Sequence, residues 1–340
     1  MKAVQISRYG GNEVLELNEK ATAPVLSKSQ ILVEVIAASI NSVDLALRSG
    51  YLKDNALIQF PAILGGDFSG IVVSGDSEFK KGDAVFGHAS ILNGGSGSFA
   101  ELTAVNIANT YLKPKKLTFT EAASLPFAGV SAFQALHKYI KISKEKKILI
   151  HGGAGGIGSI SIQLAKDAGA YVATTVNKNN IDFAKKLGAD LVIDYQNENF
   201  ELILKEYDAV LDTIGGDMMD RSFKVLKRHG IIVSLTEVPK PELIEKYDVS
   251  AIWQIGNLNS VKLKTLSKLI DDGRINAHVD KIYPIVQIKD AFRYYEEGHP
   301  RGKVVIKVKG ELIGKINEVL SLNKVKKIVN SEGEAHVLPV

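Results

Sequence analysis

The spacing of apolar and polar residues divides the chain into two regions with different periods. Residues 1 to about 120 contain short apolar or alternating runs separated by glycine-rich turns, and residues 30–37 form the longest of these runs. Runs of this length between turn residues are typical of β-strands. We therefore expect a compact, barrel-like β domain at the start of the chain.

From about residue 119 the apolar residues recur at helical spacing, and from residue 148 short apolar runs alternate with helical segments. The predicted strands are residues 148–150, 171–176, 191–195, 208–213 and 231–235. Strands that alternate with helices favour right-handed βαβ units. The expected fold class is therefore α/β, with a Rossmann-type, doubly wound parallel sheet after the β-rich domain.

The pattern after about residue 275 returns to that of the first region, with a predicted helix at 291–297 and a closing strand at 303–308. We therefore predict one domain from residues 1–122 and 276–308, a second from 123–275, and an extension over 309–340. The apolar residues of this extension have helical spacing, which predicts a docked helix or a subunit interface.

Two local features of the first region carry their own predictions. Ser42 is expected to cap a short helix that ends at Gly50. Residues 94–98, which are glycines and serines, are expected to form a flexible surface loop because of their composition.

Five glycines stand within seven residues, 152–158, between the strand at 148–150 and a helical segment. Three of them, Gly153, Gly155 and Gly158, match the spacing G-x-G-x-x-G. We expect the first to allow the turn off the strand, the second to let a pyrophosphate approach the backbone, and the third to let the helix pack closely. A strand, a glycine turn and a helix in this order indicate a dinucleotide site.

The main chain of this glycine turn is expected to bind the anionic part of the ligand. The N–H groups of Gly155, Gly156 and Ile157 should be free at a helix N-terminus, where the helix dipole favours negative charge. The residues expected to contact the dinucleotide here are Gly153, Ala154, Gly155, Gly156 and Ile157.

The residues after the second predicted strand bear on which coenzyme binds. Sites for NAD(H) usually place a carboxylate about 20 residues after the glycines, where it binds the ribose hydroxyls. Here the strand ends in Val176 and continues with Asn177 and Lys178, so the carboxylate is missing. An acid would repel a 2′-phosphate, whereas these two residues can bind one, and we therefore predict NADP(H).

Composition and charge exclude several other classes of protein. The net charge of +4 is spread over many lysines, so nucleic-acid binding is not expected. There is no cysteine, so a thiolate nucleophile and a cysteine-ligated zinc site are impossible. The seven histidines show no metal-binding spacing, and we expect them to be surface or hydrogen-bonding residues. No apolar run is long enough to span a membrane and no secretory signal is evident, so a cytoplasmic protein is expected.

The order of these features and several motifs resemble the medium-chain dehydrogenase/reductase superfamily, and more narrowly its zinc-independent quinone oxidoreductase branch. The resemblance covers about residues 1–308 and leaves the extension unassigned. The residues that carry it are 41–44 (NSVD), 48–50 (RSG), 60–61 (FP), 65–70 (GGDFSG), 82–87 (GDAVFG), 98–101 (SFAE), 122–126 (AASLP), 188–190 (GAD), 194–195 (DY) and 299–305 (HPRGKVV).

The resemblance implies a GroES-like catalytic domain before the Rossmann domain, and it implies a chemistry without metal. Zinc alcohol dehydrogenases of this superfamily have Cys where Asn41 stands and Gly-His-Glu where residues 65–67 read Gly-Gly-Asp. With neither present, the expected reaction is NADPH-dependent hydride transfer to a quinone or an α,β-unsaturated carbonyl. The family also suggests a homodimer.

Site residues follow from the resemblance by position. Asn41 would lie at the nicotinamide and substrate end, and Tyr51 is a candidate active-site phenol. Some quinone reductases have Tyr where Ala46 stands, so a tyrosine-assisted mechanism is not secured here. A structural role in helix capping or ion pairing is favoured for Asp44 and Arg48. The expected coenzyme contacts outside the glycine turn are Ser131 at the nicotinamide, Tyr195 near the 2′-phosphate, Leu235 after the fifth strand and Lys303 on the closing strand.

Two alternative functions remain open from the sequence. One is a 2-enoyl thioester reductase, which would need a longer channel with a basic entrance. The other is a non-catalytic NADPH-binding protein, since this branch includes lens proteins and RNA binders, although the diffuse charge gives RNA no support. The substrate is expected to contact loops at residues 41–60, 90–98 and 235–258, with Tyr51, Ile58, Trp253 and Ile255 as apolar lining.

Overall fold

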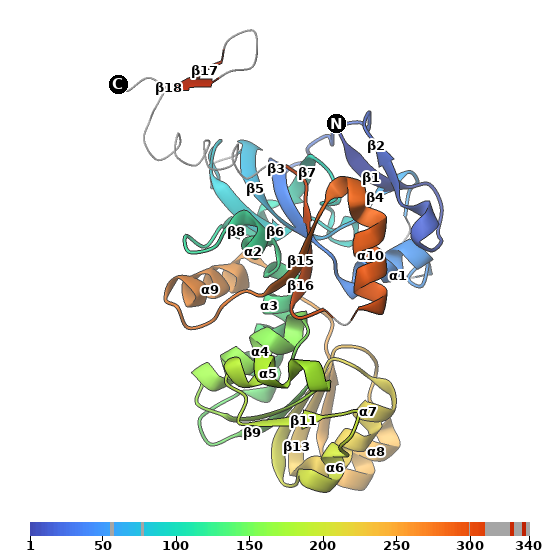
Figure 1. The fold of residues 1–340 in the computed structure, drawn as a ribbon, viewed down its shortest axis with the longest axis vertical. Coiled ribbons are helices and arrows are strands. Elements are labelled where there is room, and N and C mark those ends of the chain that lie inside the picture. Colours follow the sequence, from blue (N-terminus) through green and yellow to red (C-terminus); the bar gives the residue numbers. More distant parts are fainter. Residues whose placement is uncertain (55–57, 76–77, 299, 310–326, 330–334, 338–340) are drawn as a thin grey trace. The chain divides into compact units, whose positions relative to one another are not determined.

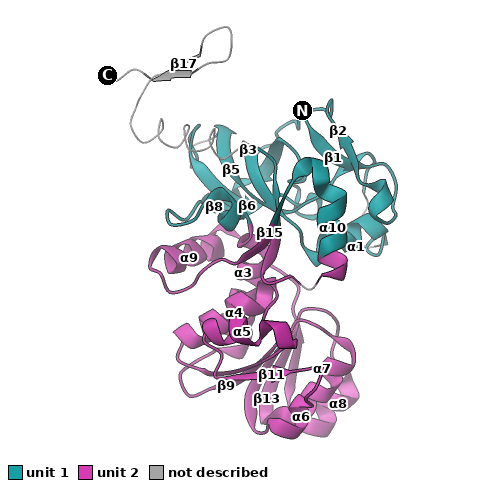
Figure 2. Cartoon of the chain, viewed as in Figure 1, with its two compact units in different colours: residues 1–123, 282–294, 305–340 teal, residues 124–281, 295–304 magenta. Residues whose placement is uncertain are grey.

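A computed structural model of the chain describes all residues except 55–57, 76–77, 299, 310–326, 330–334 and 338–340. The described chain forms two compact units (Figures 1 and 2). Unit 1 contains residues 1–123, 282–294 and 305–340, and unit 2 contains residues 124–281 and 295–304. Residues 276–281 and 295–304 therefore group with the second unit, whereas we expected the whole of 276–308 in the first domain.

Unit 1 is built mainly from antiparallel strands, as the short apolar runs predict. Its large sheet has the order β15-β16-β3-β5-β6-β8, with β7 also paired to β3, and a small sheet has the order β2-β1-β4. The strand bounds are β1 (Ala3–Ile6), β2 (Glu16–Asn18), β3 (Gln30–Ser39), β4 (Ala62–Ile63), β5 (Asp67–Ser74), β6 (Ala84–His88), β7 (Leu102–Asn106), β8 (Thr110–Leu112), β15 (Val279–Pro284) and β16 (Lys303–Lys307).

The helices of unit 1 follow β3, β8 and β15 along the chain. They are α1 (Ser42–Ser49), α2 (Phe119–Ala123) and most of α10 (Ile288–Glu297). The core of unit 1 contains four fully buried phenylalanines. Phe68 and Phe86 come from the paired strands β5 and β6, and Phe99 packs edge-to-face on Phe292 of α10.

Unit 2 contains a parallel sheet of the order β11-β10-β9-β12-β13-β14, as predicted for a doubly wound fold. The strands are β9 (Lys147–His151), β10 (Tyr171–Val176), β11 (Leu191–Asp194), β12 (Tyr207–Asp212), β13 (Leu226–Ser234) and β14 (Ser250–Trp253). The first five match the predicted strands, and β14 is an additional edge strand.

Helices cover both faces of this sheet (Figure 1). One face is packed by α6, α7 and α8 through residues that include Phe200, Met219 and Leu243, and the other carries α5 through Ala184. The helices of the unit are α3 (Pro126–Phe133), α4 (Gly156–Asp167), α5 (Ile181–Lys186), α6 (Phe200–Ile203), α7 (Gly216–Ser222), α8 (Pro241–Tyr247) and α9 (Ser260–Asp271). No helix in the described residues is both long enough and apolar enough to cross a membrane.

Two local expectations are corrected by the structure. The N-cap of α1 is Asn41 rather than Ser42, because the Asp44 carboxylate accepts the N–H of Asn41 at 2.8 Å, while Gly50 ends the helix with φ +81° as expected. Residues 95–98 are not a free loop. The N–H of Gly97 bonds to the carbonyl of Ala89 at 2.9 Å, and a Cβ there would lie 2.3 Å from the carbonyl oxygen of Ile63. These glycines permit close packing rather than flexibility.

Only short pieces of the extension are described. Two strands, β17 (Lys327–Val329) and β18 (Ala335–Val337), pair antiparallel, so residues 327–329 are not in the expected helix. The rest of the predicted helix lies outside the described residues.

Candidate functional site

The glycine turn of unit 2 begins one residue earlier than predicted. Gly152 has φ +66°, so it makes the turn off β9 that was expected of Gly153. Gly153 is required for another reason, because a Cβ there would lie 2.0 Å from Oγ1 of Thr174 on β10. At Gly158 a Cβ would lie 2.2 Å from the carbonyl oxygen of Gly152, which confirms the predicted close packing of the helix.

The main-chain donors at the start of α4 differ from the prediction by one residue. The N–H of Gly155 is not free, since it donates to the carbonyl of Gly152 at 2.9 Å. Gly156 and Ile157 open α4, where first-turn N–H groups have no acceptor within the helix. A Cβ added at Gly155 would meet only one atom, at 3.4 Å. The protein therefore leaves space beside an anion-binding helix end, as a pyrophosphate requires.

A segment from near the end of the chain, residues 302–303, packs against this turn. Gly302 donates its N–H to the carbonyl of Ala154 at 2.7 Å and forms a parallel bridge with Gly155. The buried side chain of Lys303 lies against the turn, with its Cδ atom 2.7 Å from the position of a Cβ at Gly156. Lys303 thus reaches the turn that is expected to hold the coenzyme.

The loop after β10 gathers the residues expected near the 2′-phosphate. Val176 pairs with Asp194 in parallel register, and the N–H of Tyr195 donates to the carbonyl of Val176 at 3.1 Å. This pairing brings Tyr195 beside the strand end from which Asn177 and Lys178 continue. The Oδ1 atom of Asn177 is buried and has no hydrogen-bond partner within the described part of the chain, whereas Lys178 is exposed. This orphaned acceptor fits a donor such as a ribose hydroxyl of a bound dinucleotide.

Sequence reasoning missed Arg301, a residue of the closing segment that contacts this loop. Its Nε atom donates to Oδ1 of Asn180 at 2.5 Å, and its Nη2 atom donates to the carbonyl of Asn179 at 2.6 Å. The only sequence signal was its place in the HPRGKVV motif, which says nothing about a contact so distant along the chain.

The remaining expected coenzyme residues of unit 2 come from two other elements. Ser131 is buried in α3, and its carbonyl accepts a hydrogen bond from Nε2 of Gln254 at 3.0 Å. Leu235 follows β13 and is half-buried, and its N–H donates to the carbonyl of Asp212 at 3.0 Å. Neither of these two contacts could be read from the spacing of residues in the sequence.

His151, the last residue of β9, anchors the base of the glycine turn. Its Nδ1 lies 2.9 Å from Oγ1 of Thr175, and its Nε2 lies 2.8 Å from Oγ of Ser222. Burial lowers the pKa of His151 to about 4, although the nearby Asp212 opposes that shift. The imidazole is therefore neutral and serves as a hydrogen-bonding residue, as expected for the histidines.

In unit 1, Asn41 belongs to a buried polar cluster. Its Nδ2 atom donates to Oδ2 of Asp67 at 3.0 Å, and Oδ1 of Asp67 lies 2.8 Å from Nδ1 of His88. All three side chains are at most 3% exposed. Ser39 adds a hydroxyl 3.3 Å from the same carboxylate. The amide of Asn41 is thus fixed by the strands beneath it.

The residues of this cluster can be compared with the zinc site of the zinc-dependent alcohol dehydrogenases. Gly66 occupies the position that the resemblance gives to a zinc-binding histidine, and a Cβ there would lie 2.1 Å from Cε1 of His88. Among the described residues, no group of three or more histidine, aspartate or glutamate side chains could hold a metal ion. The residues present therefore do not fit the zinc site.

The other expected substrate-end residues are exposed. Tyr51 follows α1 and is 83% exposed, in contrast to the buried Asn41. Trp253 and Ile255 of unit 2 are 47% and 68% exposed. Asp44 caps α1, as the structural role predicted, and Arg48 donates to Oδ1 of Asn12 at 2.5 Å and lies over the ring of Phe292.

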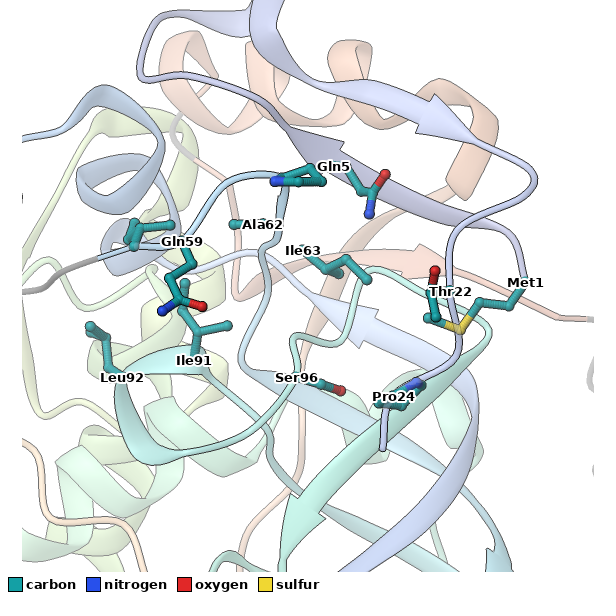
Figure 3. Close-up of a pocket in the computed structure, with 12 residues that line it drawn as sticks. Met1, Gln5, Thr22, Pro24, Gln59, Ala62, Ile63, Ile91, Leu92 and Ser96 are labelled. Carbon is teal, nitrogen blue, oxygen red and sulfur yellow. The ribbon is translucent and has the colours of Figure 1, made fainter. Parts of the chain in front are cut away.

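A cavity of about 430 Å³ opens in unit 1 (Figure 3). Gln59, Ile91 and Leu92, from the expected substrate loops, lie on one side, and Met1, Thr22 and Pro24 lie on the other; Ile58 also lines the cavity. Its lining side chains are all uncharged, and neither Asn41 nor Tyr51 is among them. This volume is within the range of small-molecule sites.

Two known protein families match the two parts of this architecture. Residues 27–115 match the alcohol dehydrogenase GroES-like domain, and residues 187–306 match the zinc-binding dehydrogenase family. The second family takes its name from a metal that the residues described above do not fit.

Relatives of known activity cover most of the chain. The 2-methylene-furan-3-one reductase of Solanum lycopersicum and the chloroplastic NADPH-dependent alkenal/one oxidoreductase of Arabidopsis thaliana are each 38% identical over 319 residues, covering 90% of this chain and 79% of the relative. Among solved structures, the quinone oxidoreductase of Coxiella burnetii superposes with a TM-score of 0.82 at 35% identity, covering 91% of this chain and 99% of that one.

Proposed function

The chain belongs to the quinone oxidoreductase and alkenal/one oxidoreductase branch of the medium-chain dehydrogenase/reductase superfamily, and we propose that it is an NAD(P)H-dependent reductase of quinones or α,β-unsaturated carbonyls. The observation that carries the proposal is the glycine turn of unit 2, which leaves room for a pyrophosphate at the N-terminus of α4. Two relatives named for the reduction of enones or alkenals support the substrate class.

The coenzyme proposed is NADP(H). No carboxylate follows β10, and Asn177, Lys178 and Tyr195 come together at the strand ends. The Arabidopsis relative is named as NADPH-dependent. The pyrophosphate would meet the N–H groups of Gly156 and Ile157, with Lys303 beside the turn.

The bound coenzyme would supply the hydride, and the protein would supply position and polarity. Reduction of an enone at its β-carbon leaves an enolate, whose oxygen needs hydrogen-bond donors and whose α-carbon needs a proton. We propose that Ser131 lies at the nicotinamide and that Asn41 and Tyr51 lie at the substrate end. The Nδ2 atom of Asn41 donates to Asp67, so the orientation of its amide is set before any ligand binds.

The proposed substrates are neutral quinones and enones, whereas the thioester alternative calls for a longer channel with cations at its entrance, and an assay separates the two. Purified protein should therefore be assayed for NADPH oxidation with a quinone, a 2-alkenal and an enoyl thioester. Turnover with the quinone or the alkenal is expected. Turnover with the thioester alone would overturn the substrate class, and binding of NADPH without turnover of any substrate would favour the non-catalytic alternative.

Two further parts of the proposal concern assembly and location. A homodimer is predicted from the family, and gel filtration with light scattering tests it. A cytoplasmic location stays a prediction, since the Arabidopsis relative is named as chloroplastic.

A further inference from the structure

Arg301 is a second basic residue at the loop after β10, besides Lys178, and it contacts this loop from the closing segment of unit 2. Its neighbour Gly302 is bonded to Ala154 of the glycine turn. The segment 301–303 therefore touches both the turn expected to bind the pyrophosphate and the loop expected to bind the adenosine ribose.

Two hydrogen bonds orient the guanidinium group of Arg301, and part of its N–H donors remains available. Nε and Nη2 donate to Asn180 and Asn179 at 2.5 and 2.6 Å, which fixes the plane of the group against the loop. Nη1 makes no hydrogen bond within the described residues, and Arg301 forms no ion pair there. An oriented cation with donors to spare matches the planar, two-pronged geometry by which arginine binds phosphate.

The loop itself holds a second unsatisfied group. Oδ1 of Asn177 is buried without a partner within the described residues, and Asn177 stands three residues before the asparagine that Arg301 holds. A buried polar atom without a partner costs free energy unless a ligand or water satisfies it. The orphaned atom is an acceptor and suits a ribose hydroxyl, whereas the arginine suits a phosphate, and dinucleotide folds place the ribose of the adenosine at this loop.

We propose that Arg301 binds the 2′-phosphate of NADP(H) and is a determinant of the preference for NADP(H) over NAD(H). This inference rests on the proposed function in so far as that function puts a dinucleotide on this loop. In this proposal the closing segment, residues 301–303, determines which coenzyme binds. The segment contacts the glycine turn through Gly302, and it binds the 2′-phosphate through Arg301.

The test compares ligands that differ only in the 2′-phosphate. Dissociation constants for adenosine 2′,5′-bisphosphate and for 5′-AMP are measured by calorimetry on the whole protein, with NADPH and NADH measured alongside. The variants are Arg301→Met, Arg301→Lys as the conservative change, and Arg228→Met as a matched control. Arg228 also lies in unit 2 and is held by a carboxylate, Asp248, at 2.8 Å.

The expected result is a selective loss. Arg301→Met should weaken binding of adenosine 2′,5′-bisphosphate and NADPH about ten- to a hundredfold, the usual size of a charge-assisted hydrogen bond, and leave 5′-AMP and NADH nearly unchanged. Arg301→Lys should recover part of the loss, and Arg228→Met should change nothing. If Arg301 only stabilised the conformation of the loop, the binding of all four ligands would weaken together. That outcome would overturn the inference.

The two proposals can fail separately. If the unmodified protein binds neither NADPH nor NADH, the proposed function falls and the assignment of Arg301 falls with it. If it binds NADPH tightly and Arg301→Met keeps the same ratio of affinities, only the assignment of Arg301 is wrong.

Discussion

Gly302 donates its N–H to the carbonyl of Ala154 across 2.7 Å, which ties the closing segment of unit 2 to the glycine turn. The positive φ of Gly302, +85°, and the 2.2 Å that would separate a Cβ there from the carbonyl oxygen of His278 show why this residue is glycine. The turn that binds the coenzyme in our proposal is thus built from two distant parts of the chain.

Two glycines of the turn should respond differently to alanine. Gly155→Ala places a methyl group in space that the protein leaves open, so it should cost at most about 1 kcal/mol of unfolding free energy. It should weaken NADPH binding roughly tenfold or more, because the pyrophosphate can no longer approach the backbone.

Gly158→Ala serves as the matched variant, because its methyl group would lie 2.2 Å from a main-chain oxygen. It should destabilise the fold by about 1–3 kcal/mol. Urea unfolding and calorimetry on both variants check this pair. Normal NADPH binding by a folded Gly155→Ala protein would contradict the site.

The buried cluster around Asn41 should be costly to break. Asp67→Ala removes the acceptor for Asn41 and the partner of His88, and leaves both polar groups buried. We expect a loss of about 3 kcal/mol in unfolding free energy, since each unpaired group costs about 1–3 kcal/mol. Asp290→Ala, which breaks an exposed ion pair with Arg293, should cost about 0.5 kcal/mol and is the control. Equal small losses in the two variants would contradict the cluster.

His151 should make the stability depend on pH in the acid range. Burial lowers its pKa to about 4 from the ordinary value of 6.5, so between these values the unfolded chain binds the proton and the folded protein does not. Stability from this residue is therefore present above pH 6.5 and is lost as the pH falls toward 4.

The size of this effect follows from the same two pKa values. The contribution should fall by about 2 kcal/mol between pH 7 and pH 5. His151→Gln, which cannot titrate, should lack this component when both proteins are unfolded with urea at the two pH values. The same pH dependence in both proteins would show that other groups cause it.

Much of the fold could be predicted because buried parallel strands are continuous apolar runs. The strand before the glycine turn, with Ile148, Leu149 and Ile150 fully buried, carries this signal clearly. The edge strand β14 does not, since its residues are exposed or half-buried, and it was not predicted. Family resemblance added the expectation that the domain before residue 123 is GroES-like, which the matched family confirms.

The details of the site depend on contacts that spacing does not encode. Gly152 and Gly153 are adjacent in the sequence, and only the structure shows which of them takes positive φ. The contact between Arg301 and Asn180 joins residues far apart in the chain, so no local pattern could have predicted it. Asn41 was expected at the substrate end, but its hydrogen bond to Asp67 required knowing which strands meet beneath α1.

The most direct measurement follows the hydride itself. Protein is mixed with NADPH deuterated at the transferable position of the nicotinamide, in both stereoisomers separately, and with a 2-alkenal as substrate. Our account predicts that one stereoisomer delivers its deuterium to the β-carbon, which gives a saturated aldehyde. An allylic alcohol labelled at the former carbonyl carbon would contradict it, as would a bound coenzyme that neither transfers deuterium to the alkenal nor is oxidised by a quinone.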